Sequence, residues 1–423
     1  MNNVWRKIKS IFTDPDLRWR VGFLLFILAV FRLGATIPVP GVNKIALEKF
    51  FEGNGLFGLL DIFSGGGLST LSIFMLGVGP YITASIVMQL LTMIFPKLKE
   101  MYNESGGDGR RKFAQYSRIL GVPLAFFQGF SYLTLLTKSG VLTETGFVAK
   151  MATVMTITAG SVLLMWLGEL ISEYGIGNGV SLIIFAGIVA RIPIVAGQVL
   201  AGFNASQIPV IVAFLVTSIL IVAGVVVISE AERPIPITYA KRIRGMKVYG
   251  GTSTYLPLRV NQAGVIPIIF ALSILLFPQM IVKFLSAVSN PTIASIAQTV
   301  GDILSNQIVY GALYFLLVVV FTYFYTAVTF DPQSVSENLQ KSGAFIPGIR
   351  PGSPTAEYIN RILTRLTLVG STFLGFIAIL PLVLAYLMGN SALTIGGTAL
   401  LIVVSVVLDL VRQVDAQLAM REY

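Results

Sequence analysis

The side chains that most often carry out chemistry in proteins are missing from this sequence. Its 423 residues contain no histidine and no cysteine, which excludes disulfides, thiol nucleophiles, histidine general bases and the usual zinc and haem sites. Carboxylates remain, but no Gly-x-Ser-x-Gly motif or phosphate-binding loop accompanies them. The glycine-rich stretch 175–179 has the wrong spacing for a dinucleotide fingerprint. We therefore expect a protein that is not an enzyme and uses no metal or other cofactor.

The ionisable residues avoid the middle of every long apolar stretch. Ion-coupled transporters place carboxylates, lysines or arginines near the centre of the bilayer. Here Arg32, Arg191 and Lys283 all lie near the ends of such stretches. This distribution disfavours a proton- or sodium-coupled transporter, although backbone carbonyls can also hold sodium. An inverted-repeat secondary transporter for a small molecule or ion stays open as the alternative function.

The composition identifies the elements that must position these residues. Hydrophobic residues make up 55% of the chain and charged residues only 12%, with a mean hydropathy of +0.82. A soluble chain carries roughly 25% charged residues. Runs such as 21–29 and 208–228 cannot all be buried in one aqueous core. The sequence therefore predicts an all-α polytopic membrane protein.

A helix needs about 20 mostly apolar residues to cross the hydrocarbon of a membrane. With that window the sequence predicts ten transmembrane helices, at residues 21–37, 71–95, 113–137, 150–171, 179–197, 208–229, 262–286, 307–330, 366–388 and 394–412. If both termini are cytoplasmic, all but seven of the 30 Lys and Arg residues lie on the cytoplasmic side, as the positive-inside rule requires. The seven others are Arg32, Lys44, Lys49, Lys138, Lys150, Arg191 and Lys283. We therefore predict a multi-pass protein with cytoplasmic N- and C-termini.

Ten spans divide into two blocks of five, and an odd block length makes the second block enter the membrane from the opposite side. We predict two inverted five-helix halves, 21–205 and 206–415, between a cytoplasmic segment 1–20 and a cytoplasmic tail 416–423. The second half contains the two largest cytoplasmic connections, 230–261 and 331–365. The inverted repeat is inferred from this count, without residue-level similarity between the blocks.

The stretch between residues 38 and 95 is too long for one span and a loop, and too short for two spans. The surplus is an eight-residue apolar segment, 56–63, followed by the glycine run 64–67. Two helical turns, roughly 12 Å, cannot cross the membrane. The segment is either an amphipathic piece on the external surface or a re-entrant half-helix folded into the protein. The Gly77-Val78-Gly79-Pro80 break favours the second interpretation, which implies a cavity.

The two largest cytoplasmic connections are basic. The first carries Arg242, Arg244 and Lys247, and the second holds Arg350 in a Pro-Gly-Ile-Arg-Pro-Gly turn. The ordinary positive-inside bias accounts for the number of charges, but not for one guanidinium on a stiff turn. Such a placement suits docking of an acidic or phosphate-rich cytoplasmic partner.

Five motifs resemble the SecY family of bacterial protein-conducting channels, in order and over nearly the whole chain. They are Asp61–Gly66 (DIFSGG), Gly79–Ile86 (GPYITASI), Gly175–Ser181 (GIGNGVS), Asn261–Pro267 (NQAGVIP) and Ser342–Gly352 (SGAFIPGIRPG). The resemblance implies a complex with SecE and SecG in the cytoplasmic membrane, in contact with anionic lipids of the inner leaflet. It also implies the SecA ATPase or a ribosome as the driver, and preproteins with signal sequences as substrates.

The resemblance further implies specific sites around an hourglass pore. Residues 57–67 correspond to a short plug helix, and we expect its plug residues to be Phe57, Leu60, Asp61, Ile62, Phe63, Gly65, Gly66 and Gly67. The pore ring maps onto Val78, Ile82, Ile184, Ile269 and Ile402. A lateral gate, between spans two and three on one wall and seven and eight on the other, carries Thr83, Gln128 and Asn261. The expected partner-binding residues are Arg350, Arg242, Arg244 and Lys247.

Overall fold

The computed structural model is mostly helical. It describes residues 14–43, 46–47, 61, 64–103, 106–142, 146–201, 208–239, 242–244, 247–249, 253–264, 266–285, 291–388 and 392–419. Each of the ten predicted spans overlaps one long helix. These helices are α2 (Pro15–Gly34), α5 (Gly79–Ile94), α7 (Gly106–Lys138), α8 (Phe147–Tyr174), α9 (Gly179–Ala201), α10 (Ile208–Glu230), α11 (Ile266–Leu285), α13 (Gln307–Thr329), α15 (Ser353–Met388) and α16 (Ala392–Ala419).

Fewer of these helices qualify as membrane-spanning than the sequence predicts. Within the described residues four, α7, α8, α13 and α15, are long and apolar enough to cross a membrane. A fifth results if α5 and α6 (Pro96–Asn103), which are bent by 118° relative to each other, form one span. Shorter apolar helices lie within α9, α10 and α11. Among the described residues the predicted count of ten is therefore not shown; α2, for example, carries three arginines.

Several helices begin where a polar side chain caps them. The Asp14 carboxylate accepts a hydrogen bond from the Asp16 N–H at 3.0 Å, and Pro15 occupies the first turn. As a result α2 begins before the apolar run that predicted it. At the start of α13, the Asn306 side chain accepts from the backbone N–H groups of Ile308 and Val309, at 3.0 and 3.4 Å.

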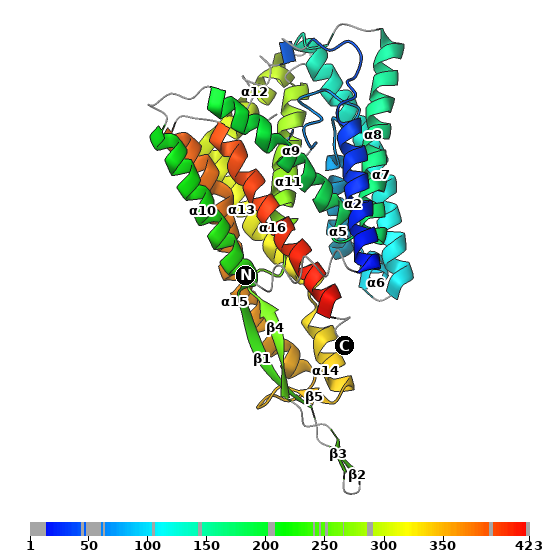
Figure 1. The fold of residues 1–423 in the computed structure, drawn as a ribbon, viewed down its shortest axis with the longest axis vertical. Helices are drawn as coiled ribbons and strands as arrows, with labels where there is room; N and C mark the ends of the chain where they lie inside the picture. Colours follow the sequence, from blue (N-terminus) through cyan, green and yellow to red (C-terminus); the bar gives the residue numbers. More distant parts are fainter. Residues whose placement is uncertain are drawn as a thin grey trace.

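The helices form two groups (Figure 1). Helices α2, α5, α7 and α8 lie on one side of the molecule, and α10, α13, α15 and α16 lie on the other. The groups meet where α9 contacts α16 and where α11 contacts α5 and α7. In Figure 1, helix α6 lies at the lower end of its group of helices and α12 (Pro291–Ser305) lies toward the upper end of the molecule. These segments were predicted on opposite sides of the membrane, and α12 is a helix where the sequence predicted only a loop.

The two long connections 230–261 and 331–365 fold together into one lobe, which the all-α prediction missed. Strand β1 (Glu232–Tyr239) pairs antiparallel with β4 (Ser253–Arg259) and with β5 (Ala344–Phe345), so the sheet order is β4-β1-β5. Alternate residues of β1, Ile235 and Ile237, are buried while Pro234 and Pro236 are exposed. Helix α14 (Pro332–Lys341) and the first turns of α15 complete the lobe. Its core consists of Ile235, Leu258, Ile346, Ile359 and Ile362.

Candidate functional site

The backbone between Ser64 and Val78 is buried without forming a helix. Short turns follow one another here, and Leu68, Leu71 and Phe74 are each at most 2% exposed. Helix α5 begins only at Gly79, so the predicted span 71–95 is wrong in its first third. Asp61, the one residue of the surplus segment 56–63 that the structure describes, is buried as well. The re-entrant position of the rest of that segment stays a prediction.

Side chains satisfy the backbone groups that a helix would have paired. The Ser64 hydroxyl accepts a hydrogen bond from the Leu68 N–H at 2.9 Å. The Thr70 hydroxyl donates to the Ala35 carbonyl at 3.0 Å, and Ser161 on α8 donates to the Gly77 carbonyl at 2.9 Å. Non-helical backbone at membrane depth is tolerated only when its polar groups find such partners. The segment 64–78 is therefore an ordered, hydrogen-bonded part of the protein interior.

The Asp61 carboxylate ties this segment to α9. Its side chain is fully buried and forms an ion pair with Arg191, and it also accepts from the Ser69 N–H at 2.7 Å. From α2, the Arg32 guanidinium donates to the Gly65 carbonyl at 3.4 Å. Of the predicted plug residues, Asp61, Gly65, Gly66 and Gly67 lie in this arrangement. The others, Phe57, Leu60, Ile62 and Phe63, lie outside the described residues.

The five predicted ring residues are all buried in the same large apolar cluster. Val78, Ile82, Ile184, Ile269 and Ile402 are each at most 8% exposed and belong to one buried apolar cluster. They come from α9, α11, α16 and the start of α5. Val78 and Ile82 share one face, since the Ile82 N–H donates to the Val78 carbonyl at 3.1 Å.

Of the three predicted gate residues, Thr83 lies on α5, Gln128 on α7 and Asn261 in the connection before α11. The Thr83 hydroxyl donates to the Gly79 carbonyl at 3.1 Å, and the Asn261 amide donates to the Gly264 carbonyl at 3.1 Å. Gln128 is half-buried on α7. The Asn261 Oδ1 atom is buried and has no hydrogen-bond partner among the described residues.

Arg350 lies on a fixed, exposed turn of the lobe. Gly348 and Gly352 on either side have φ values of +83° and +99°, which a glycine adopts without strain. The Thr355 hydroxyl donates to the Arg350 carbonyl at 2.8 Å, and the Ser336 hydroxyl donates to the Gly352 carbonyl at 2.6 Å. The Arg350 side chain takes no part in these backbone contacts and is exposed.

The other predicted partner-binding residues lie on a separate two-stranded ribbon. Arg242 and Arg244 belong to β2 (Arg242–Arg244), and Lys247 belongs to β3 (Lys247–Tyr249). In this ribbon Arg244 pairs with Lys247. The three basic residues therefore lie close together on the two paired strands.

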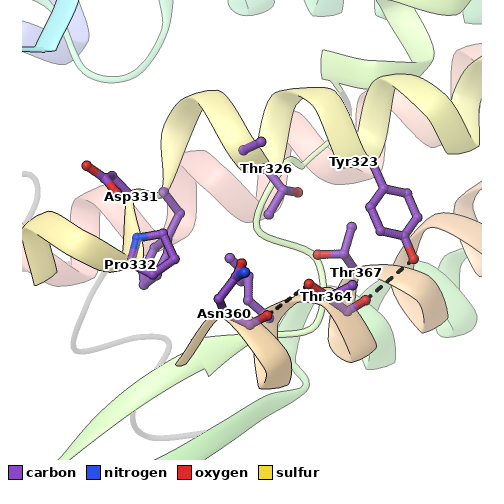
Figure 2. Close-up of a pocket in the computed structure, with 10 residues that line it drawn as sticks. Tyr323, Thr326, Asp331, Pro332, Asn360, Thr364 and Thr367 are labelled. Atoms are coloured by element: carbon purple, nitrogen blue, oxygen red, sulfur yellow. Dashed lines mark hydrogen bonds between the residues drawn. The ribbon is translucent and has the colours of Figure 1, made fainter. Parts of the chain in front are cut away.

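A hydroxyl-rich pocket of about 200 Å³ lies between α13 and α15, away from the ring. Figure 2 shows Tyr323 and Thr326 on one helix facing Asn360, Thr364 and Thr367 on the other. The Tyr323 hydroxyl donates to the Thr364 carbonyl at 3.5 Å. Within the described part of the chain, no group of three or more Asp or Glu residues could hold a metal ion.

Comparison with known proteins decides the family. The SecY family model matches residues 72–411. The SecY translocase subunit of Thermotoga maritima is 44% identical, over 99% of this chain and 97% of its own length. That of Thermus thermophilus is also 44% identical, over 97% of this chain and 94% of its own length.

The chain belongs to the SecY family.

Solved structures agree with the fold of this SecY-family chain. One described as a protein-conducting channel superposes with a TM-score of 0.63 at 20% identity, covering 93% of this chain and 90% of the other. Sec61 from a canine ribosome–channel complex superposes with a TM-score of 0.60 at 17% identity, over 93% of this chain and 90% of the other. These similarities confirm the predicted helical fold. Membership of the SecY family leaves the secondary-transporter alternative without support.

Sequence reasoning missed the ion pairs that join helices of this SecY-family chain. Glu169 on α8 forms an ion pair with Arg118 on α7. The Asp61–Arg191 pair was missed as well, although both residues were noted separately. A signal was present in each case, because an isolated charge at the edge of an apolar stretch needs a partner from another segment.

Proposed function

We propose that this chain is the channel-forming subunit that passes unfolded preproteins across the cytoplasmic membrane. It also releases signal and membrane segments sideways into the lipid. The single observation that carries this proposal is that five aliphatic side chains from four segments belong to one buried apolar cluster, which also contains Phe74 of the non-helical segment 64–78. A ring of this kind, backed by a plug, forms an hourglass pore.

The ring would act as a hydrophobic gate. Aliphatic side chains offer water no hydrogen-bond partner, so a narrow neck lined by them stays dry and blocks ions. The same side chains can separate around an unfolded chain and close again behind it. The plug, residues 57–67, would close the external half of the pore.

The two halves, 21–205 and 206–415, would separate at the junction of α11 with α5 and α7. Thr83, Gln128 and Asn261 lie on the helices and connections that form this junction. The buried, unpaired oxygen of Asn261 supports the idea that this contact is made to open, since a permanently closed contact would satisfy that atom.

The lobe would bind the cytoplasmic partner that drives translocation. Arg350 and the basic residues Arg242, Arg244 and Lys247 would receive acidic or phosphate-rich surfaces of a SecA-type ATPase or a ribosome. SecE and SecG would be the membrane partners. This places the lobe and both termini in the cytoplasm, where the basic residues also face anionic lipids.

Reconstitution tests this function. The purified chain with its small membrane subunits, in vesicles, should import a labelled preprotein into a protease-protected space when the motor ATPase and ATP are added. No protected preprotein, with the complex shown to be inserted, would contradict the proposal. Uptake of a small solute without preprotein would instead favour the transporter alternative.

A further inference from the structure

The hydroxyl-rich pocket between α13 and α15 lies where two predicted membrane spans end. The sequence places the end of one span at residue 330 and the start of the next at residue 366, and the pocket is lined by residues from Tyr323 to Thr367. Its volume of about 200 Å³ equals that of roughly seven water molecules. The pocket therefore has room for one small polar group at the boundary between hydrocarbon and water.

Most of the hydroxyl groups in this pocket can only accept hydrogen bonds from a ligand. The Thr326 hydroxyl donates its proton to the Thr322 carbonyl at 2.7 Å, and the Thr364 hydroxyl donates to the Asn360 carbonyl at 2.9 Å. The Tyr323 hydroxyl donates to the Thr364 carbonyl at 3.5 Å. Each of these oxygens keeps lone pairs for a further partner. The pocket thus offers more acceptors than donors.

A carboxylate at the edge of the pocket adds to this excess of acceptors. Asp331 caps α14 by accepting from the Gln333 N–H at 3.0 Å and the Ser334 hydroxyl at 2.8 Å, one bond to each carboxylate oxygen. The charge is not neutralised by these neutral donors. None of the lining residues that the structure describes is a lysine or an arginine. The pocket therefore suits a cation that donates several hydrogen bonds and does not suit an anion.

Thr367 provides a second indication of a ligand. The residue is only 4% exposed, and its hydroxyl has no hydrogen-bond partner in the described part of the chain. Figure 2 shows this hydroxyl directed into the space between Thr326 and Asn360. Because buried polar groups are almost always paired, the Thr367 hydroxyl is expected to meet a bound molecule there.

The surface next to the pocket changes from apolar to basic along the helices. Leu316 and Val320 on α13 and Leu368 on α15 are each more than half exposed. They lie on the same faces as Tyr323 and Thr364, toward the middle of the predicted spans. Next to Thr364, Arg365 is exposed and has no ion pair among the described residues. The order apolar surface, guanidinium, acceptor-rich pocket matches the acyl chains, phosphate and terminal ammonium of a phospholipid.

We propose that this pocket binds the primary ammonium head group of a membrane phospholipid of the ethanolamine type. The three N–H groups of the ammonium donate to Asp331 and to the threonine oxygens, and the phosphate accepts from Arg365. A choline head group has no N–H to donate and is larger. The site goes beyond the proposed channel function and does not depend on it, because it involves neither the ring nor the plug.

Two variants test the pocket by different routes. Ala327→Leu places a larger side chain in the wall of the pocket. Its control is Ala312→Leu, since Ala312 is also exposed on α13 but does not line the pocket. Asp331→Asn removes the charge and keeps the cap of α14, because asparagine caps helices as well as aspartate. Its control is Glu337→Gln on α14, where the carboxylate is 56% exposed.

The experiment counts bound lipids by native mass spectrometry. The chain with its small membrane subunits is stripped of lipid in detergent and given phosphatidylethanolamine, phosphatidylcholine or phosphatidylglycerol with identical acyl chains. Wild type and both controls should retain phosphatidylethanolamine about fivefold more than phosphatidylcholine, a modest preference because the ion pair stays partly exposed. Ala327→Leu and Asp331→Asn should reduce retention of phosphatidylethanolamine to the level of phosphatidylcholine.

Equal retention of the two lipids by wild type, or an unchanged preference in both variants, would overturn the proposal. Stronger retention of phosphatidylglycerol that Asp331→Asn leaves unchanged would also overturn it, because that head group carries no cation.

A second measurement uses only the wild-type protein. Phosphatidylethanolamine with a photoreactive acyl chain should label the peptides that contain Leu316, Val320 or Leu368. Excess unlabelled phosphatidylethanolamine should compete with this labelling, and phosphatidylcholine should compete about fivefold less well. Labelling that both lipids suppress equally, or that avoids α13 and α15, would contradict a head-group site in this pocket.

Discussion

Arg412 near the end of α16 fixes Glu230 at the end of α10. Its Nε and Nη2 atoms both donate to Oε1 of Glu230, at 3.0 and 2.8 Å, and Nη2 also donates to the Ser229 carbonyl. Asp409, one turn earlier, lies 3.7 Å from the same guanidinium. Because β1 begins two residues after Glu230, this contact sets the direction in which the chain enters the lobe.

We therefore expect Arg412→Ala to destabilise the protein by about 1–2 kcal/mol, since charged hydrogen bonds are lost but Glu230 can still reach water. Arg412→Lys should recover only part of this loss, because an ammonium group cannot reproduce several donations from one plane. Thermal unfolding in detergent measures both effects. Equal melting temperatures for wild type and Arg412→Ala would show that this contact does not stabilise the folded protein.

Charge reversal at Arg350 should abolish ATP-driven import while leaving the protein folded. The turn is held by backbone bonds from Thr355 and Ser336, which Arg350→Glu does not remove. Lys341→Glu is the control, because Lys341 is 76% exposed on α14 of the same lobe. Normal import by Arg350→Glu would show that Arg350 is not needed for binding the motor. Single changes at Arg242, Arg244 or Lys247 should be milder, because clustered charges share the interaction.

Polar substitutions in the ring should make the resting channel leak ions. Ile82→Ser combined with Ile269→Ser gives water hydrogen-bond partners in the neck, so we expect a several-fold higher conductance in a planar bilayer. The matched control is Ile308→Ser with Leu316→Ser on α13, where both side chains face outward at 74% and 56% exposure. Equal currents from the ring variant and wild type, with the protein shown to be inserted, would contradict the ring assignment.

Asn261→Leu should shift the gate equilibrium by a few-fold. Hydrogen bonds between membrane helices contribute about 0.6 kcal/mol on average, and the Asn261 amide makes one local bond to the Gly264 carbonyl. Acceptance of a panel of defective signal sequences measures the shift, with Thr299→Val on the exposed face of α12 as control. If Asn261→Leu accepted the same defective signal sequences as the wild type, with the same efficiency, Asn261 would have no role in the gate.

Tyr314→Phe should stabilise the protein slightly. The Tyr314 ring is 1% exposed, and its hydroxyl has no partner among the described residues. Removing an unsatisfied buried hydroxyl without changing shape should raise stability by about 1 kcal/mol. Tyr323→Phe serves as control, because that hydroxyl donates to the Thr364 carbonyl. A lower melting temperature for Tyr314→Phe would reveal a partner for this hydroxyl in solution.

The helices could be predicted from the sequence because a long run of apolar residues by itself indicates a helix that is removed from water. That Val78, Ile82, Ile184, Ile269 and Ile402 share a buried apolar cluster was also predictable, but only through the family resemblance. Nothing local to Ile402 indicates that it belongs to the same cluster as Ile82. The span 71–95 failed for a related reason. Its first residues are apolar enough for a helix, but Gly77 and Pro80 prevent it, and contacts from α2, α8 and α9 stabilise turns instead.

The lobe and the interhelical ion pairs could not be predicted because they depend on contacts between distant segments. The pairing of Thr238 with Phe345 joins two connections that are separated by two predicted spans. The pairs Arg118–Glu169 and Asp61–Arg191 depend on which helices are neighbours. In β1 a signal was present, since Ile235 and Ile237 alternate with prolines as in a half-buried edge strand.

Helix α15 gives the lobe a mechanical connection to the membrane part. It runs without interruption from Ser353 to Met388, 36 residues or roughly 54 Å. Its first turns are part of the lobe core, and its remainder contacts α13 and α16, the second of which carries Ile402. The described chain has no loop between the docking turn and this rod that could absorb a rotation. If a motor bound at Arg350 turned the lobe, α15 would tilt with it and would displace the helices that it contacts in the membrane part. Binding of the motor and opening of the pore would then be parts of one rigid-body movement.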